Sequence, residues 1–209
     1  MKIHNLKQGS DEWLKKRECK VTGSKFSRAI SKTKSTRFGL IKELIEQKYA
    51  NVIDDGYKSP SMTRGTDEEK YAVQAYVERY GDEIEVIGMC EHDEFDWLMF
   101  SPDRYTNDRK TYLEFKCPDS TTMIDYMLDN KLPSVYKAQI LLSFIINEKQ
   151  TSAKLIAYDA RFKEYNHQMV VFTVTREELK DDIADALEML KVFREEWIAV
   201  DDFYQKIIF

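Results

Sequence analysis

Cysteine and histidine are scarce in this chain of 209 residues, which has three of each, scattered along the sequence. The cysteines are odd in number and have no CxxC spacing, so we expect ordinary buried thiols rather than a disulfide framework, a zinc site or an iron–sulfur site; they are Cys19, Cys90 and Cys117. The histidines are equally dispersed, which argues against a histidine metal site; they are His4, His92 and His167.

The sequence also lacks a long apolar run. Its longest one, Ile140 to Asn147, is far shorter than the roughly 20 residues that cross a bilayer, and the opening stretch MKIHNLKQGS has no apolar signal-peptide region. We therefore expect a cytoplasmic protein without a membrane partner. The chain is 43% hydrophobic and 12% aromatic, which is typical of a globular rather than a disordered protein, and its length suits one domain.

The net charge of −5 hides a strong asymmetry along the chain. Residues 1–42 contain twelve Lys or Arg against three Asp or Glu, a local charge of +9, so the remaining residues carry −14. This separation favours a basic N-terminal part that grips phosphates and an acidic remainder that holds a metal. A merely solvated basic surface is the alternative.

Cap residues and hydrophobic spacing predict a mixed α/β order. The expected helices are a short one through Arg17 capped by Ser10, one at 25–30 capped by Thr22, and others at 36–50, 65–80, 120–129, 134–147 and from Arg176 onwards. The expected strands cover about 84–89, 96–101, 111–117, 152–158 and 169–174, with loops at 56–60 and 105–110. This order predicts an α/β fold with a central mixed β-sheet flanked by helices.

Residues 101–118, SPDRYTNDRKTYLEFKCP, place charged side chains among apolar ones. Their alternation puts Glu114 and Lys116 on one side of a strand, and Asp103 would lie at the mouth of a hairpin beside Glu114. A solvated pair is the alternative reading, but apolar neighbours indicate central strands, where unpaired charges are costly. Two carboxylates suit Mg²⁺ or Mn²⁺, and a lysine beside them can hold the attacking water. We therefore expect metal-dependent phosphodiester hydrolysis.

Five motifs occur in one order: QGSDEWLKKRECKVTGSKFSRAI near the N-terminus, RG-x3-E (Arg64 to Glu69), SPD (Ser101 to Asp103), EFKCP (Glu114 to Pro118) and Y-x2-Q (Tyr136 to Gln139). In this order, from about residue 8 to residue 160, the chain resembles the lambda exonuclease family. These proteins are also called YqaJ-like viral recombinases or phage-type alkaline exonucleases, and belong to the PD-(D/E)xK nuclease superfamily. The resemblance implies a restriction-endonuclease-like core in a single nuclease domain, with a basic helical part at 1–60, a catalytic core at 61–175, and a C-terminal helix and tail at 176–209.

The resemblance also implies roles for particular residues. The metal ligands would be two carboxylates and one backbone carbonyl, those of Asp103, Glu114 and Phe115. Lys116 would orient or deprotonate the water, and Glu69 would approach the site from its helix, with Glu68 as the rival for that role. Gln139 would lie near the scissile group, or would be a structural polar residue. The terminal 5′-phosphate would be received by Arg17, Ser24 and Ser101. Two further candidates for DNA binding are Trp13, which we expect mainly to pack, and Arg64.

One position departs from the family pattern, because Arg104 stands where a glycine usually follows SPD. It either contacts the DNA backbone or changes the hairpin turn. The implied activity is a Mg²⁺- or Mn²⁺-dependent 5′→3′ exonuclease that digests one strand of linear double-stranded DNA and leaves 3′ overhangs for phage-type recombination. The alternatives are a structure- or sequence-specific endonuclease and a catalytically silent DNA-binding module.

The resemblance implies an assembly and a setting as well. It implies a phage or prophage protein in a bacterial cell, a ring-shaped homotrimer threaded by DNA, and a single-strand annealing protein as a partner. From the sequence itself, the apolar stripe of the last helix should be consumed by the core, so the tail Phe203 to Phe209 is expected at or near a subunit contact.

Overall fold

The computed structural model describes residues 1–50 and 60–208, without the side chains of 60–63, 66 and 208. The predicted loop 56–60 lies outside the described residues, except for Pro60, which begins a helix. The helices are α1 Asp11–Arg17, α2 Gly23–Ala29, α3 Lys34–Tyr49, α4 Pro60–Tyr80, α5 Ser120–Asp129, α6 Ser134–Ile146 and α7 Lys180–Ile208, with a short 3₁₀ helix at Tyr165–His167. The strands are β1 Lys2–His4, β2 Ile84–Glu85, β3 Met89–Glu91, β4 Met99–Phe100, β5 Arg104–Thr106, β6 Thr111–Lys116, β7 Ser152–Tyr158 and β8 Met169–Thr175.

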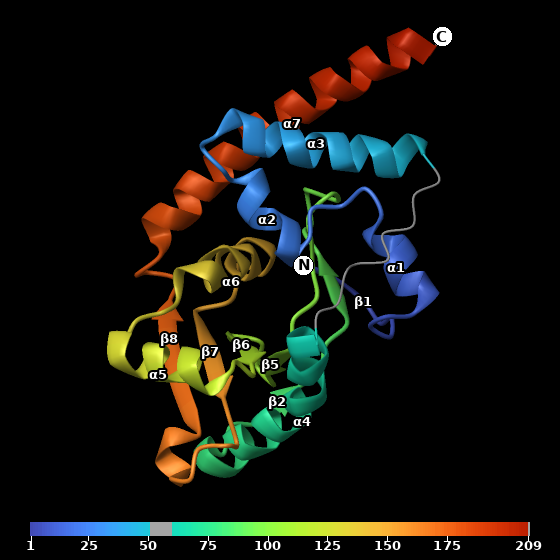
Figure 1. Ribbon diagram of the computed structural model, residues 1–209. Coiled ribbons are helices and arrows are strands. Elements are labelled where there is room, and N and C mark those ends of the chain that lie inside the picture. The colour runs from blue at the N-terminus through green and yellow to red at the C-terminus, as the bar shows by residue number, and fades with distance from the viewer. Residues whose placement is uncertain (51–59, 209) are drawn as a thin grey trace.

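The strands form two sheets, which Figure 1 shows among the helices. The larger sheet has the order β2-β5-β6-β7-β8; β6 and β7 run parallel, and the other three pairs are antiparallel. The crossover from β6 to β7 contains α5 and α6, as a parallel connection requires. The smaller sheet joins β1, β3 and β4. The predicted central mixed sheet flanked by helices is therefore confirmed.

The alternation along β6 separates the two faces of the larger sheet. Leu113 and Phe115 pack with Ala72 and Tyr76, which lie one turn apart on α4. Tyr112 belongs to the other core cluster, which includes buried residues of α2, α3, α6 and α7. Glu114 lies on the same face as Tyr112, so its carboxylate is enclosed between the sheet and α6.

The last helix has one buried stripe, and apolar side chains are exposed near its C-terminal end. Leu179 precedes it, and Ile183, Leu190 and Phe193 within it are at most 8% exposed, so the predicted packing of this stripe into the core is confirmed. Beyond this stripe, α7 still contacts α3, because Asp201 accepts hydrogen bonds from Lys48 and Tyr49, whereas the side chain of Phe203 is 65% exposed. In the described part of the chain, no helix is both long and apolar enough to span a membrane.

Local sequence signals predicted some helix ends correctly and others incorrectly. The hydroxyl of Ser10 accepts a hydrogen bond from the backbone N–H of Trp13 at 3.3 Å, so it caps α1 as predicted. Thr22 precedes α2 but makes no side-chain capping bond. Gly81 has φ +68°, a conformation that suits glycine, and α4 ends directly before it. The last helix begins at Lys180 rather than at Arg176, and it continues to Ile208, so it includes the described residues of the predicted tail.

The strand predictions need four corrections. The predicted hairpin loop 105–110 contains a strand, because Arg104 and Tyr105 pair with β6. The predicted strand 96–101 is reduced to β4, which pairs with β3 in the smaller sheet and not with β6. The predicted strand 84–89 is divided between the sheets, and β1 was not predicted. Directly before β3 the backbone passes close to β1, because a Cβ added at Gly88 would lie 2.1 Å from the carbonyl oxygen of His4.

Candidate active site

Two carboxylates and a lysine meet at the end of β6. Glu114 is completely buried, and its Oε1 atom contacts the Nζ atom of Lys116, which lies two residues along the same face. Asp103 immediately precedes β5, and its Oδ2 atom accepts a hydrogen bond from the backbone N–H of Phe115 at 2.8 Å. The antiparallel pairing of β5 with β6 thus fixes Asp103 beside the strand that carries the other two residues.

Burial and mutual repulsion disfavour the ionised forms of these acids. Burial raises the pKa of Glu114 to about 8, and the charge of Asp103 adds to this effect, although Lys116 and Gln139 oppose it. Burial also raises the pKa of Asp103, against the opposing charge of Lys116. For Lys116, the neighbouring carboxylates outweigh burial and raise the pKa of the amine. Without a metal, the site therefore holds a charged lysine and carboxylates that resist ionisation.

A third carboxylate reaches the site from α4. Burial and the charge of Asp103 both raise the pKa of Glu69, which places this side chain within the electrostatic range of the pair. Its Oε1 atom lies 3.7 Å from the Nη1 atom of Arg104. The charge of Glu68 acts on Cys117, as that of Glu69 also does, and on Arg161. Of the two rivals from the sequence, Glu69 is thus the one that faces Asp103.

Gln139 contacts the site directly from α6. Its Nε2 atom donates to the Oε1 atom of Glu114 at 2.7 Å and lies 3.4 Å from the hydroxyl of Tyr112. The start of α2 lies against the same side chain, because a Cβ added at Gly23 would be 3.6 Å from Cγ of Gln139. The amide therefore links the buried carboxylate to the helix that carries Ser24.

The available ligands fit a divalent metal ion. The Oε2 atom of Glu114 is buried and has no hydrogen-bond partner among the residues that the structure describes, so it remains available to a ligand. The predicted set of two carboxylates and the carbonyl of Phe115 is all oxygen, which suits a hard cation that keeps several waters. The described residues contain no cluster of three or more His, Cys, Asp or Glu side chains with metal-binding geometry, so water would have to complete the coordination.

Four residues of the N-terminal part lie in successive contact: Trp13, Arg17, Thr22 and Ser24. The guanidinium of Arg17 lies 4.1 Å from the ring centroid of Trp13, and its Nη2 atom donates to the hydroxyl of Thr22 at 3.4 Å. That hydroxyl is in turn 3.4 Å from the hydroxyl of Ser24. The structure thus brings together Trp13, Arg17 and Ser24, three of the five predicted DNA-binding residues.

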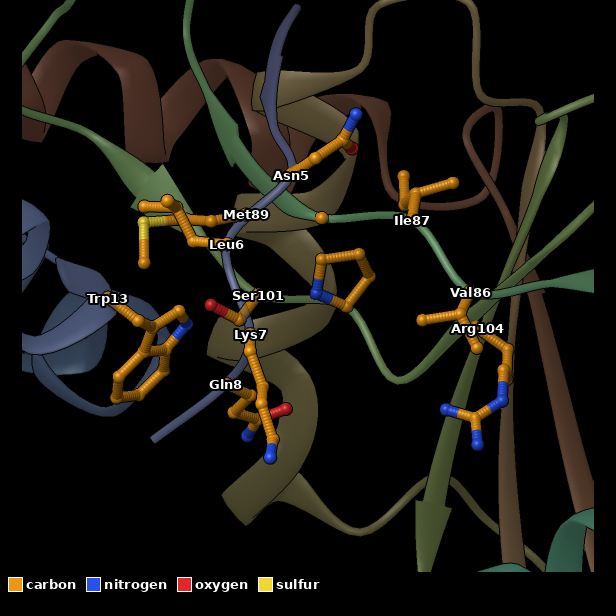
Figure 2. A pocket seen from close by; sticks show the side chains of 12 residues that line it. Asn5, Leu6, Lys7, Gln8, Trp13, Val86, Ile87, Met89, Ser101 and Arg104 are labelled. Atoms are coloured by element: carbon orange, nitrogen blue, oxygen red, sulfur yellow. The ribbon is translucent and has the colours of Figure 1, made fainter. Parts of the chain in front are cut away.

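A cavity of about 400 Å³ lies beside this group, and Figure 2 shows its lining. Trp13, Ser101 and Arg104 line it together with the segment from Asn5 to Gln8 and the segment from Val86 to Met89. The Oγ atom of Ser101 is buried without a hydrogen-bond partner in the described part of the chain. The cavity therefore combines apolar walls, positive charge and an available hydroxyl.

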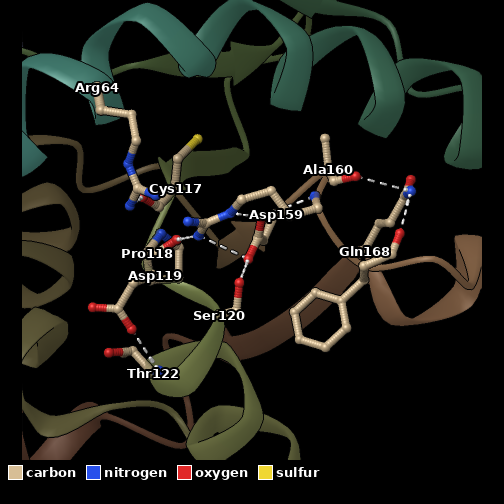
Figure 3. Close-up of polar contacts among 11 residues, drawn as sticks. Arg64, Cys117, Pro118, Asp119, Ser120, Thr122, Asp159, Ala160 and Gln168 are labelled. Carbon is tan, nitrogen blue, oxygen red and sulfur yellow. Dashed lines mark hydrogen bonds and ion pairs between the residues drawn. The ribbon is translucent and has the colours of Figure 1, made fainter.

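Arg64 does not line this cavity; its Nη2 atom lies 3.4 Å from the carbonyl oxygen of Cys117, just after Lys116. Figure 3 shows the polar contacts around Pro118, Ser120 and Asp159. The buried carboxylate of Asp159 accepts from Ser120 at 2.6 Å and from Arg161 at 2.7 Å, and Arg161 also donates to the carbonyl of Pro118 at 3.2 Å. These contacts hold the turn between β6 and α5.

The sequence marked Thr22 only as a helix cap, and it did not single out Asp159 or Arg161. One signal was available for Asp159, because it follows the last residue of β7, and parallel strands bring their carboxyl ends to the same edge of a sheet. No comparable signal marked Thr22, whose contact with Arg17 depends on how α1 and α2 are arranged.

Solved structures share this fold. The alkaline exonuclease LHK-Exo from Laribacter hongkongensis matches with a TM-score of 0.83 and 23% identity, over 95% of this chain and 98% of that chain. Its complex with dAMP matches with a TM-score of 0.78 and 23% identity, over 95% and 100% of the two chains. A phage-related exonuclease from Haemophilus somnus 129PT matches with a TM-score of 0.64 and 15% identity, over 86% and 95%.

Sequence comparison gives the family directly. No curated protein matches the chain. The model of the YqaJ-like viral recombinase domain matches residues 12–150, which include all five motifs except the first residues of the N-terminal one. Because this match covers well over half of the sequence, the chain belongs to the family of YqaJ-like viral recombinase domains.

Proposed function

We propose that this protein is a metal-dependent nuclease with a PD-(D/E)xK core, which digests one strand of linear double-stranded DNA from its 5′ end. The resulting 3′ overhangs would serve phage-type recombination. The observation that carries this proposal is the convergence of Asp103, Glu114 and Lys116 at the end of β6, with one carboxylate oxygen left without a partner among the described residues. The names of the structural neighbours, all exonucleases, support it.

Each residue of the cluster has a distinct task in this proposal. Asp103, Glu114 and the carbonyl of Phe115 would hold the cation, Mg²⁺ or Mn²⁺, which would supply Lewis-acid activation of water and stabilise charge on the phosphodiester. Lys116 orients the water toward phosphorus. Gln139 holds the carboxylate of Glu114 in one orientation through its hydrogen bond. Glu69 adds a third acidic group from α4.

The DNA end would be received next to this cluster. Arg17, Ser24 and Ser101 would bind the 5′-phosphate through charge-assisted and hydroxyl hydrogen bonds. Trp13 would form the wall of the adjoining cavity, and Arg64 would contact the backbone near the turn after Lys116. The charge of +9 in residues 1–42 supports this placement.

We further propose a single domain, a homotrimeric ring around DNA and a single-strand annealing protein as partner, in a phage or prophage protein acting in the bacterial cytoplasm. The single domain is supported by the main core cluster, which joins α2 and α3 to the sheet, α6 and α7. The exposed apolar end of α7, with Phe203 and Ile207 about two-thirds exposed, supports an intermolecular contact there.

The test is digestion of linear duplexes labelled at either the 5′ or the 3′ end, with and without a 5′-phosphate, in Mg²⁺ and in EDTA. We expect release from the 5′ end, in Mg²⁺ only, and preference for the phosphorylated end. A covalently closed circular duplex distinguishes the exonuclease from the endonuclease alternative, because only an endonuclease cuts it.

Asp103→Ala, Glu114→Ala and Lys116→Ala should abolish cleavage while the protein still folds and binds DNA. Glu188→Ala, an exposed acid of α7, is the control. Full activity of Glu114→Ala would refute the proposal.

A further inference from the structure

Arg104 lies between the acidic cluster and the cavity. It is the first residue of β5, and its backbone is fixed because it pairs with Leu113 of β6. Its side chain is 23% exposed and lines the cavity, as Figure 2 shows. The Nη1 atom donates to the carbonyl oxygen of Asp103, and the same atom lies 3.7 Å from Oε1 of Glu69.

Each of the two cations in the cluster forms an ion pair with a different acid. Lys116 contacts Glu114, whereas Arg104 is the cation in ion-pair contact with Glu69. Two positive charges thus face three carboxyl groups, those of Glu69, Asp103 and Glu114. Carboxylates that lie close together repel one another when ionised, and a neighbouring cation reduces this repulsion when no metal is bound.

The contact between Arg104 and Glu69 is weak enough for another cation to replace Arg104. At 3.7 Å it is an ion pair, but it is too long for a hydrogen bond, and the Glu69 side chain is 32% exposed. Such a pair is weaker than the direct contact of Lys116 with the buried Glu114. To turn away from Glu69, the guanidinium has only its hydrogen bond to the carbonyl of Asp103 to retain or break, while the pairing with Leu113 keeps the backbone in place.

We propose that Arg104 is an internal counter-ion that pairs with Glu69 when the metal is absent and competes with the metal for the acidic cluster. Arg104 therefore sets the affinity of the site for a divalent cation. This inference rests on the proposed metal-dependent function. It assigns Arg104 a positioning role toward Glu69 and not a part in the chemical step.

The test measures metal binding without DNA. Wild type, Arg104→Ala, Arg104→Lys and the control Arg79→Ala are titrated with Mn²⁺ by calorimetry at pH 7.5. Arg79→Ala removes the same charge from the far end of α4, where the guanidinium donates to the carbonyl of Tyr165. We expect Arg104→Ala to bind Mn²⁺ about ten-fold more tightly than wild type, because a repelling and competing charge is lost. Arg104→Lys and Arg79→Ala should stay within about two-fold of wild type.

Thermal unfolding gives a second measurement that does not depend on activity. In EDTA, Arg104→Ala should melt at a lower temperature than wild type, and saturating Mn²⁺ should remove the difference, because a ligand that binds the folded state raises its stability. Unchanged or weaker Mn²⁺ binding by a folded Arg104→Ala protein would overturn the inference and leave the proposed function intact. If wild type itself binds no Mn²⁺, the metal-dependent function fails, and this inference fails with it.

Discussion

Replacing Glu114 by Gln should remove a pH-dependent loss of stability from the metal-free protein, although it also removes a proposed metal ligand and the carboxylate that contacts Lys116. Burial raises the pKa of Glu114 from 4.5 to about 8, so folding near pH 7 forces this acid to take up a proton. An acid whose pKa rises on folding loses stability as pH rises above its unfolded value, until the folded value is reached. At pH 7 the loss is about 3 kcal/mol, and at pH 5 it is below about 1 kcal/mol, at 1.36 kcal/mol per pH unit.

Glutamine does not titrate, so the variant should escape this pH-dependent loss. Its amide oxygen can accept from Gln139 as Oε1 does, but its NH₂ group would take the place of Oε2, which lacks a partner in the described structure. That costs about 1 kcal/mol at any pH and cancels when two pH values are compared.

The assay is urea unfolding of both proteins in EDTA at pH 5 and pH 7. We expect the variant to gain about 2 kcal/mol on wild type between the two values, and to have no nuclease activity in Mg²⁺. Glu188→Gln, which changes an exposed acid on α7, should show no such gain. A stability difference between Glu114→Gln and wild type that is the same at both pH values would refute the argument that burial shifts the pKa of this carboxyl.

Three further predictions concern the DNA end, the fold and the assembly. Arg17→Ala should slow digestion of 5′-phosphorylated ends much more than that of 5′-hydroxyl ends, and an equal loss would reassign Arg17 to general backbone contact. Gly88→Ala should lower the free energy of unfolding by about 1–3 kcal/mol, because its Cβ would strike the carbonyl of His4, whereas Gly39→Ala, with open space around it, should not. Light scattering should give a trimer mass, which deletion of 203–209 should reduce; a monomer would exclude the ring.

The elements that the sequence predicted well are those with local signals. The alternation from Thr111 to Lys116 placed Glu114 and Lys116 on one face, and the structure confirms it. The side chain of Ser10 and the conformation of Gly81 mark helix ends through contacts within a few residues. In such cases the physical cause lies inside the segment, so a single sequence contains it.

The elements that were missed depend on distant partners. Strand β1 has only three residues, and it exists because Lys2, Ile3 and His4 pair with a segment nearly ninety positions later. The polar segment of β5 resembles a loop until its pairing with β6 is known. In the same way, motif order indicated the acids of the candidate site, but the contact of Arg104 with Glu69 could be found only from the three-dimensional arrangement.

The pairing of β1 with β3 has a consequence for synthesis in the cell. Residues 2–4 pair with residues 89–91, so β1 has no partner until the ribosome has added about 87 more residues. At about 5–20 residues per second, this takes roughly 4–17 s, far longer than the microseconds in which short hairpins form. During that interval the backbone of residues 2–4 is without its strand partner. Because β1 is only three residues long, it offers other nascent chains a short template for mispairing, which limits aggregation on the polysome.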